Sequence, residues 1–148
     1  MGIAYVTPDY ATAYFADRPD AEAFLALDAP DKFLAFAGQL IADYCVFYDE
    51  AGAYTFAADN APDFIKRATC EEALYLATLG KDPTAALQVL TLGIVKTDDG
   101  TTFDHRFKPD ILGVNVRRIL TANGGDVAPE ASGYADAASG ISQGAVTK

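Results

Sequence analysis

The stretch that most constrains the fold is APDKFLAFAGQLIADY, residues 29–44, because its apolar side chains recur at the spacing of an α-helix. The apolar positions that share one wide face, continued into the following CVF, are Phe33, Leu34, Ala37, Leu40, Ile41, Tyr44, Cys45 and Phe47. So wide a face has to be covered from more than one side, and we expect a central helix. Asp28 is the predicted N-cap, and Pro30 suits the first turn.

Two helices are predicted before this central one. The first starts at Thr7-Pro8-Asp9, where a capping hydroxyl, a proline and an acid follow one another, and it ends before Pro19. A short helix, DAEAFLAL, follows over residues 20–27.

Two more helices are predicted after it. One starts at Asn60 to Pro62 and ends at Gly80, with Pro83 beyond it. Its expected buried residues are Ile65, Ala68, Ala73, Leu76 and Leu79. The last helix opens at Pro109 and ends at Asn123-Gly124-Gly125. Its expected inward residues are Ile111, Leu112, Val116, Ile119 and Leu120.

Two segments break the helical pattern. Residues 49–62, DEAGAYTFAADNAP, are predicted to form a loop in which YTF fits either a short strand or a docked arm. Residues 87–107 are rich in β-branched side chains on both sides of the turn signal TDDG, which predicts a β-hairpin. The predicted fold is therefore mainly α: a compact four- to five-helix bundle over residues 1–123 with one hairpin.

The C-terminal residues 124–148 are predicted to form an extended arm. They are rich in Gly, Ala and Ser and too weakly apolar to fold alone. Ordering some 25 residues costs roughly 25–50 kcal/mol of backbone entropy, whereas each buried apolar anchor returns about 1.5–3 kcal/mol. We therefore expect the arm to lie on another molecule, adding to a sheet edge or threading a groove. Its predicted anchors are Val127, Tyr134, Ile141 and Val146.

The charge argues against a nucleic-acid-binding role. Asp and Glu outnumber Lys and Arg by 21 to 11, which gives a net charge of -10. Proteins that grip DNA draw much of their affinity from basic groups that neutralise phosphates. The basic doublets Lys66-Arg67 and Arg117-Arg118 both fall on predicted helices, where a solvated face or an ion pair explains them.

The sequence offers no catalytic or metal-binding motif, so we expect neither an enzyme nor a cofactor. His105 is the single histidine, and Cys45 and Cys70 lack the spacing of a zinc site. Both cysteines are predicted to be small buried hydrophobic residues. No apolar run reaches the roughly 18 residues of a membrane span, and no secretory signal is visible, so a soluble cytoplasmic protein is expected.

Two stretches resemble a family of bacteriophage proteins encoded among head genes, namely YVTPDYATAYFADR over 5–18 and PDFIKRATCEEALYLA over 62–77. The helix over 29–44 between them, and the later hairpin and helix, keep the order of elements in that family. The family comprises head-completion, or head–tail connector, proteins that are often labelled DnaT-like single-stranded-DNA-binding proteins. The resemblance covers roughly residues 3–122, and it rests on packing patterns rather than on catalytic signatures.

The resemblance implies two alternative functions. As a connector, the chain would form a homo-oligomeric ring of about a dozen copies beneath the portal protein, extend the DNA channel, and receive a tail or tail-completion protein. It would then reside in the virion, at the head–tail interface, after assembly in the host cytoplasm. As a DnaT-like module, it would bind single-stranded DNA. The acidic composition favours the connector, because an acidic wall lets DNA slide without sticking.

Two interfaces are predicted for the connector. The arm, through its four anchors, is expected to dock on the portal. The hairpin is expected to contact a neighbouring ring or the tail. Its predicted contact residues are Ile94, Lys96, Asp98, Asp99, Thr101 and Phe103.

A salt titration of filter binding separates the two functions. We expect the full chain to retain no labelled single-stranded DNA at moderate salt, because its net charge repels phosphate. A genuine single-strand binder would instead show tight retention that falls steeply as salt rises.

Overall fold

The computed structural model describes residues 2–80, 82–92, 94–96, 102–103 and 110–127. The chain divides into two units. The first runs from the N-terminus to Pro83 and from Leu112 to Ala128, and the second contains Thr84–Ile111. The described residues are mainly helical, as predicted. They also contain a three-stranded antiparallel sheet and a separate two-stranded hairpin.

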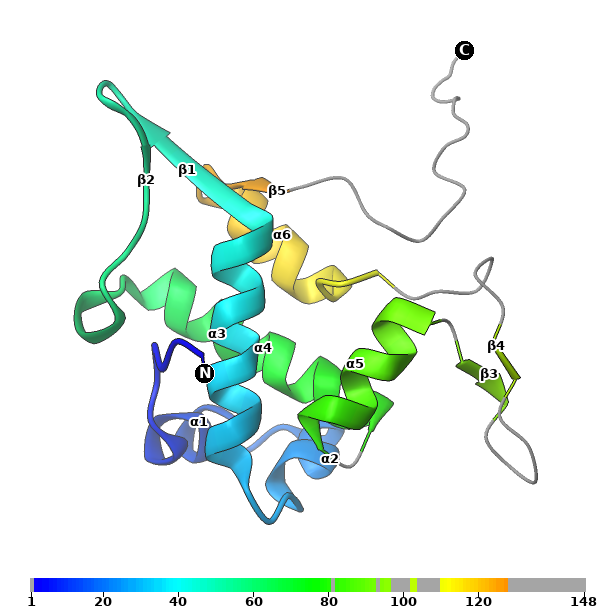
Figure 1. The fold of residues 1–148 in the computed structure, drawn as a ribbon. Coiled ribbons are helices and arrows are strands. Elements are labelled where there is room, and N and C mark those ends of the chain that lie inside the picture. Colours follow the sequence, from blue (N-terminus) through cyan, green and yellow to red (C-terminus); the bar gives the residue numbers. More distant parts are fainter. Residues whose placement is uncertain (1, 81, 93, 97–101, 104–109, 128–148) are drawn as a thin grey trace. The chain divides into compact units, whose positions relative to one another are not determined.

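Helix α4 is the centre of the first unit, where it contacts α1, α2, α3 and α6. Figure 1 shows α4 crossing α3, with α1 and α2 near the start of α3 and a β-hairpin beyond its end. The helices of this unit are α1 (Pro8–Tyr14), α2 (Glu22–Leu25), α3 (Pro30–Tyr44), α4 (Asp63–Leu79) and α6 (Val114–Ala122), with short 3₁₀ turns at Pro19–Ala21 and Ala58–Asn60.

The predicted start of α1 is confirmed, whereas the predicted cap of α3 is wrong. Thr7 Oγ1 accepts a hydrogen bond from the amide of Tyr10 at 3.1 Å, and Pro8 occupies the first turn. Before α3 the N-cap is Ala29, which makes no side-chain capping bond. Asp28 therefore lies one residue too early, because Pro30 fixes where the helix begins.

The central helix is shorter than predicted, because residues 45–49 form strand β1 (Cys45–Asp49). The side chains of Cys45 and Phe47 are buried, and that alternation fits a strand as well as the helical spacing did. These residues form a strand because they have two pairing partners. Strand β1 pairs antiparallel with β2 (Gly52–Tyr54) on one side and with β5 (Asp126–Val127) on the other.

The turn between β1 and β2 uses residues suited to it. Asp49 pairs with Gly52, so only Glu50 and Ala51 lie between the strands. Asp at the first and Gly at the fourth position is favoured in the common type I turn, and Gly52 has a φ of +116° that other residues rarely adopt. Asp49 Oδ1 also accepts from the amide of Ala51 at 2.8 Å. Part of the predicted loop is therefore a hairpin, and Tyr54 of the YTF stretch ends its second strand.

The two glycines after α6 are part of the folded body, not the start of the arm. The amide of Gly125 donates to the Leu120 carbonyl at 2.8 Å, and that of Gly124 donates to the Thr121 carbonyl at 3.1 Å. This pair of hydrogen bonds, with Gly124 at a φ of +90°, is the Schellman motif that closes helices. It leads directly into β5, so residues 124–127, which were predicted to belong to the arm, are part of the body, and the rest of the predicted arm lies outside the described residues.

Helix α6 also starts later than predicted. Ile111 and Leu112 are buried as expected, but they precede the helix, and Gly113 is its N-cap. Pro109, the predicted start, lies outside the described residues.

In the second unit, residues 87–92 are helical and not the first strand of a hairpin. They belong to α5 (Pro83–Leu92), whose proline at the start and whose Ala, Leu and Gln residues favour a helix. The hairpin itself is present but shorter: β3 (Ile94–Lys96) pairs antiparallel with β4 (Thr102–Phe103).

The core of the first unit consists of large side chains from all its helices. Those that are fully buried include Phe15, Phe24, Phe33, Leu34, Ile41, Ile65, Leu76, Leu112, Val116 and Leu120. The N-terminal segment closes one side of this core by lying on α3, where the amide of Ile3 donates to the Ala35 carbonyl at 3.0 Å. Gly38 makes that approach possible, since a Cβ there would overlap the Ile3 carbonyl oxygen.

Replacing Gly38 by alanine therefore tests the docking of the N-terminal segment. Helix propensity alone would make Gly38→Ala stabilising by about 0.8–1.0 kcal/mol. We expect the reverse, a loss of about 1–3 kcal/mol typical of overpacking, measured by urea denaturation. Lys32→Ala, at an exposed position of the same helix, is the control and stays within about 0.5 kcal/mol of the wild type. A stabilised Gly38→Ala variant would show that the segment does not rest on α3.

Candidate interaction surface

The described residues offer no cluster of side chains that could hold a metal ion. Within the ranges that the structure describes, no three His, Cys, Asp or Glu side chains gather as a metal site. None of the helices in those ranges combines the length and apolar character that a membrane crossing requires.

The cysteines are buried and free, as predicted for small hydrophobic residues. Burial, with a smaller contribution from Asp126, raises the pKa of Cys45 to about 11. Burial and Glu71 raise the pKa of Cys70 to about 12. Both thiols therefore stay protonated and poorly nucleophilic at neutral pH.

Adjacent carboxylates at Glu71 and Glu72, both buried, hold other elements onto α4. Glu71 Oε2 accepts from the hydroxyl of Tyr14 at 2.7 Å and from Nη1 of Arg18 at 2.6 Å. Glu71 thus links α4 to α1 and to the segment that follows α1.

Arg18 is held on both sides. It donates from Nε and Nη2 to the two carboxylate oxygens of Asp20, each at 2.9 Å, besides its bonds to Glu71. These bonds raise the pKa of the Arg18 guanidinium, so it stays charged at every working pH. Of the two ion pairs, the one with Glu71 matters more for stability. Glu71 is 6% exposed, and a buried carboxylate without a partner destabilises the fold.

Glu72 positions the start of α6. Its Oε1 accepts from the amide of Gly113, the N-cap of α6, at 3.0 Å. A carboxylate there satisfies an amide that the helix cannot and lies at the positive end of the helix dipole. Neighbouring positions on a helix point in different directions, so the two glutamates bind different elements and do not form a catalytic pair.

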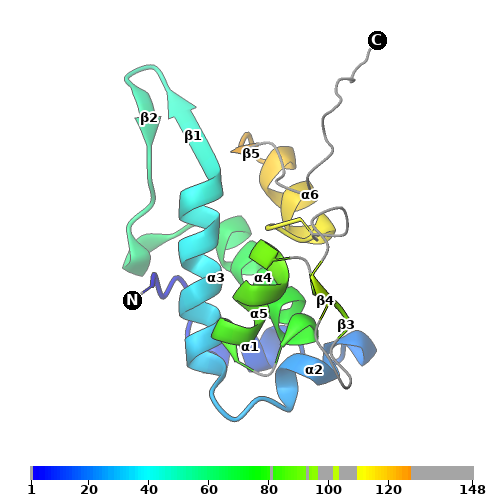
Figure 2. The ribbon, with the colours of Figure 1, turned by 45° about the vertical axis from the view of Figure 1, so that its right-hand side comes forward.

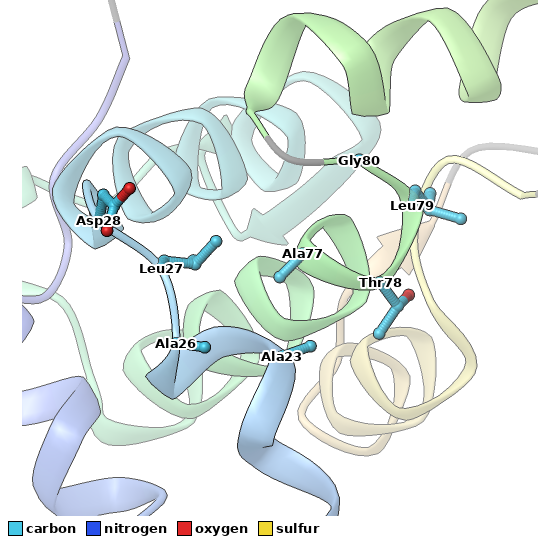
Figure 3. A pocket seen from close by; sticks show the side chains of 8 residues that line it. All are labelled: Ala23, Ala26, Leu27, Asp28, Ala77, Thr78, Leu79 and Gly80. Carbon is cyan, nitrogen blue, oxygen red and sulfur yellow. The ribbon is translucent and has the colours of Figure 1, made fainter.

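A shallow hollow lies between α2 and the end of α4. Its volume is about 490 Å³. The residues around it are mostly small or apolar: Ala23, Ala26, Leu27, Asp28, Ala77, Thr78, Leu79 and Gly80. Figure 3 shows Leu27 and Ala77 extending toward one another across it. Asp28 is the only ionisable residue of the lining, so the hollow has no pair of groups for acid–base chemistry.

The β1–β2 hairpin is the most prominent surface feature of the first unit. In Figures 1 and 2 it extends from the end of α3, clear of the helices. Four aromatic rings anchor its base: those of Phe47, Tyr54, Phe56 and Phe64. Phe47 has centroids of Phe56 and Phe64 at 5.1 and 5.7 Å, in the tilted and edge-on geometries that aromatic pairs prefer.

The outer part of the hairpin is exposed and acidic. Tyr48 is 60% exposed, and Asp49 and Glu50 at the turn are exposed beside it. An isolated two-stranded hairpin is marginally stable in water, so the aromatic base and β5 are what keep this one folded. An exposed aromatic ring on a projecting hairpin is typical of a surface that binds another protein.

The structure separates the predicted contact residues. Val127 lies in β5, where it pairs with Cys45 of the same chain, so it belongs to the body and not to the arm. Ile94, Lys96 and Phe103 lie in β3 and β4, as predicted for the hairpin. The remaining predicted residues lie outside the described residues: Asp98, Asp99, Thr101, Tyr134, Ile141 and Val146.

Sequence reasoning missed the β1–β2 hairpin as a candidate surface. Its signal was present as DEAG, residues 49–52, an Asp and a Gly at the ends of a four-residue turn between aromatic residues.

Comparison with family models, with curated proteins and with solved structures finds no match.

Replacing Arg18 by methionine tests the buried ion pair. Burial raises the pKa of Glu71, but the bonds from Arg18 and Tyr14 outweigh it and hold that pKa below the usual value of a glutamate. The ionised carboxylate therefore stabilises the wild type above pH 4.5, and that stabilisation is lost as pH falls through the folded-state pKa. We expect Arg18→Met to lose about 3 kcal/mol at pH 7, the low end for a broken buried pair, because Arg18 is 30% exposed.

The direction in which this loss of stability changes with pH tests whether Glu71 is its cause. Without Arg18, burial dominates and raises the pKa of Glu71, so the variant recovers stability relative to the wild type between pH 7 and pH 5. Arg67→Met is the control, since Arg67 and Asp63 form an exposed pair at 3.3 Å and its loss costs less than about 1 kcal/mol at either pH. Urea denaturation at both values measures these differences. Equal losses in the two variants would contradict the role given to Glu71.

Proposed function

We propose that this chain is a structural virion protein, a head-to-tail adaptor of a tailed bacteriophage. Copies of the chain assemble into a ring beneath the portal protein, extend the DNA channel and link it to the tail. The proposal joins the family resemblance of residues 3–122 to a surface built for contact between proteins.

The observation that carries the proposal is the projecting β1–β2 hairpin. It exposes Tyr48 on a strand that is anchored by an aromatic cluster. Edge strands and exposed aromatic residues are the means by which proteins recruit further chains. Such a feature belongs to an assembly unit rather than to a solitary domain.

The placement of basic side chains argues against gripping DNA. Arg18 is bound to Asp20 and Glu71, and Arg67 is paired with Asp63. The ammonium of Lys66 lies 5.6 Å from the centre of the Tyr10 ring. These cations are therefore engaged within the body, whereas a single-strand binder presents them along a groove.

The aromatic residues are placed just as poorly for stacking on bases. Phe15, Phe24, Phe33 and Phe47 are buried. Tyr48 is the most exposed of the large apolar side chains on the hairpin, and it has Asp49 and Glu50 beside it, whose charge repels phosphate. Single-stranded-DNA binding, as a DnaT-like module, is thus the weaker alternative.

The arm gives the ring a second means of attachment. It leaves the body at β5, and the 21 residues that follow Val127 reach about 70 Å when extended. We assign its anchors Tyr134, Ile141 and Val146 to the portal, and the β3–β4 hairpin to contacts with the tail. Many weak arms on one ring act together, because each bound arm raises the effective concentration of the next.

Deleting residues 128–148 tests the proposal without cutting into the sheet. We expect the full chain to co-sediment with the portal protein of the same phage, and the truncated chain to lose at least about tenfold in apparent affinity. The matched control keeps the length but replaces Tyr134, Ile141 and Val146 by serine, which removes the anchors alone. Electron microscopy of the mixture would show rings on the portal. If the full chain does not co-sediment with the portal protein and does bind single-stranded DNA, the adaptor proposal is wrong and the single-stranded-DNA-binding alternative is supported.

A further inference from the structure

We infer that the tip of the β1–β2 hairpin of one copy docks on the first two turns of α6 of the next copy. The inference deepens the proposed function and rests on it, because it identifies the contact that joins neighbours in the ring. It is carried by two surface patches of opposite charge that one chain presents in different places.

The first patch is the hairpin tip, defined as Tyr48, Asp49 and Glu50. All three side chains are exposed, and residues 45–54 contain two acids and no Lys or Arg. Asp49 is partly occupied by its bond to the amide of Ala51, so Glu50 is the more available charge of the two. The patch thus combines one aromatic ring with two neighbouring carboxylates.

The second patch is the outer face of α6, defined as Val114, Arg117 and Arg118. Val114 is 75% exposed, the most exposed large hydrophobic residue of the described chain. The helix VNVRRILTA contains two arginines and no acid, in a chain whose net charge is -10. Arg118 donates from Nη2 to Oδ1 of Asn115 at 2.9 Å, and a guanidinium has five N–H donors in all.

The two patches match in chemistry. Tyr48 can cover Val114, while Glu50 meets the arginines. Opposite charges at the edge of an interface steer the partners together and fix their register, whereas the aromatic contact excludes water.

The other helices of the first unit lack the combination that α6 offers. Helices α1 and α2 contain no Lys or Arg. Helices α3 and α4 contain basic residues but no exposed large hydrophobic residue. Among these helices, α6 is therefore the best partner for an acidic tip.

The two patches lie at opposite ends of a continuous piece of structure. Strand β5 pairs with Cys45 and Val46 at the base of β1, and it follows the C-terminal end of α6. From this junction the hairpin tip is about 13 Å away along β1, and the start of α6 is about 13 Å away along the helix. Figures 1 and 2 show the two running in different directions, so a tip cannot reach α6 of its own chain.

This arrangement fits a ring. A contact between two different patches is heterologous, so each copy offers a tip to one neighbour and a helix to the other. Such contacts close into a ring when the rotation between copies divides a full turn. A contact between identical patches would stop at a dimer.

Charge reversal tests the pairing in the full chain. Glu50→Lys and Arg118→Glu should each raise the concentration for half-assembly about tenfold, measured by mass photometry with and without portal. The double variant should recover, because the two reversed side chains again carry opposite charges. Equal amounts of the two single variants should also assemble together in alternating order, since the Glu50→Lys tip then meets the Arg118→Glu helix and the unchanged tip meets the unchanged helix. Glu22→Lys and Lys32→Glu, at exposed positions outside both patches, are the matched controls and leave assembly unchanged.

A disulfide experiment tests proximity independently of charge. The native thiols are buried and protonated, so cysteines placed by Tyr48→Cys and Val114→Cys in one chain are the reactive pair. Mild oxidation should give a ladder of linked multimers, whereas either single variant should give dimers at most.

The outcomes separate the inference from the proposed function. Rings that assemble on the portal with no effect of either charge reversal, or a double-cysteine variant that yields dimers alone, would overturn the hairpin–helix contact and leave the adaptor standing. A ladder and a charge rescue without portal binding would support the contact and overturn the adaptor. A wild-type chain that stays monomeric in both conditions would overturn both.

Discussion

The architecture of the first unit depends on two adjacent buried carboxylates of α4. Glu71 accepts hydrogen bonds from Tyr14 and Arg18 of the N-terminal region, and Glu72 accepts one from the amide of Gly113 at the start of α6. Burying charge is costly, so each carboxylate stabilises the fold only when its partners are in place. The pair therefore makes the position of α1 and the position of α6 depend on one turn of α4. Because Glu72 binds the start of α6, that turn also positions the surface patch on α6.

The hairpin depends on a different kind of interaction. It continues from the last turn of α3, and aromatic rings from β1, β2, the following loop and α4 surround its base. The side chain of Tyr48 at its tip does not pack in the core and is exposed to water. A packed base with an exposed tip suits an assembly contact, since a hairpin that is already folded loses little conformational entropy when it binds. The acidic residues at the tip reduce the risk that this edge pairs indiscriminately.

The proposed adaptor combines these parts with the arm. In that proposal, the hairpin and α6 make the contacts between neighbours, and residues 128–148 make the contacts with the portal. Separate surfaces let a ring form and attach without competing for the same residues. The acidic body suits a channel lining, because like charge keeps the passing DNA from binding. The Schellman motif at Gly124 and Gly125 directs the chain into β5, which is the last described element of the sheet.

The sequence by itself determined the helices of the first unit, although it did not reveal α5. The cap at Thr7, the prolines at the starts of α1 and α3, and the apolar spacing of residues 33–41 and 65–76 act within one or two turns, and local signals of this kind can be recognised without the fold. It also placed both cysteines in the interior and closed the last helix at Asn123 to Gly125. Tertiary structure alone decided the rest. Residues 45–49 satisfy a helical and a strand pattern equally, and only the partners at 52–54 and 126–127 choose between them. The roles of Glu71 and Glu72 depend on partners 53 and 41 residues away, and burial of a carboxylate is settled by which donors the fold brings to it.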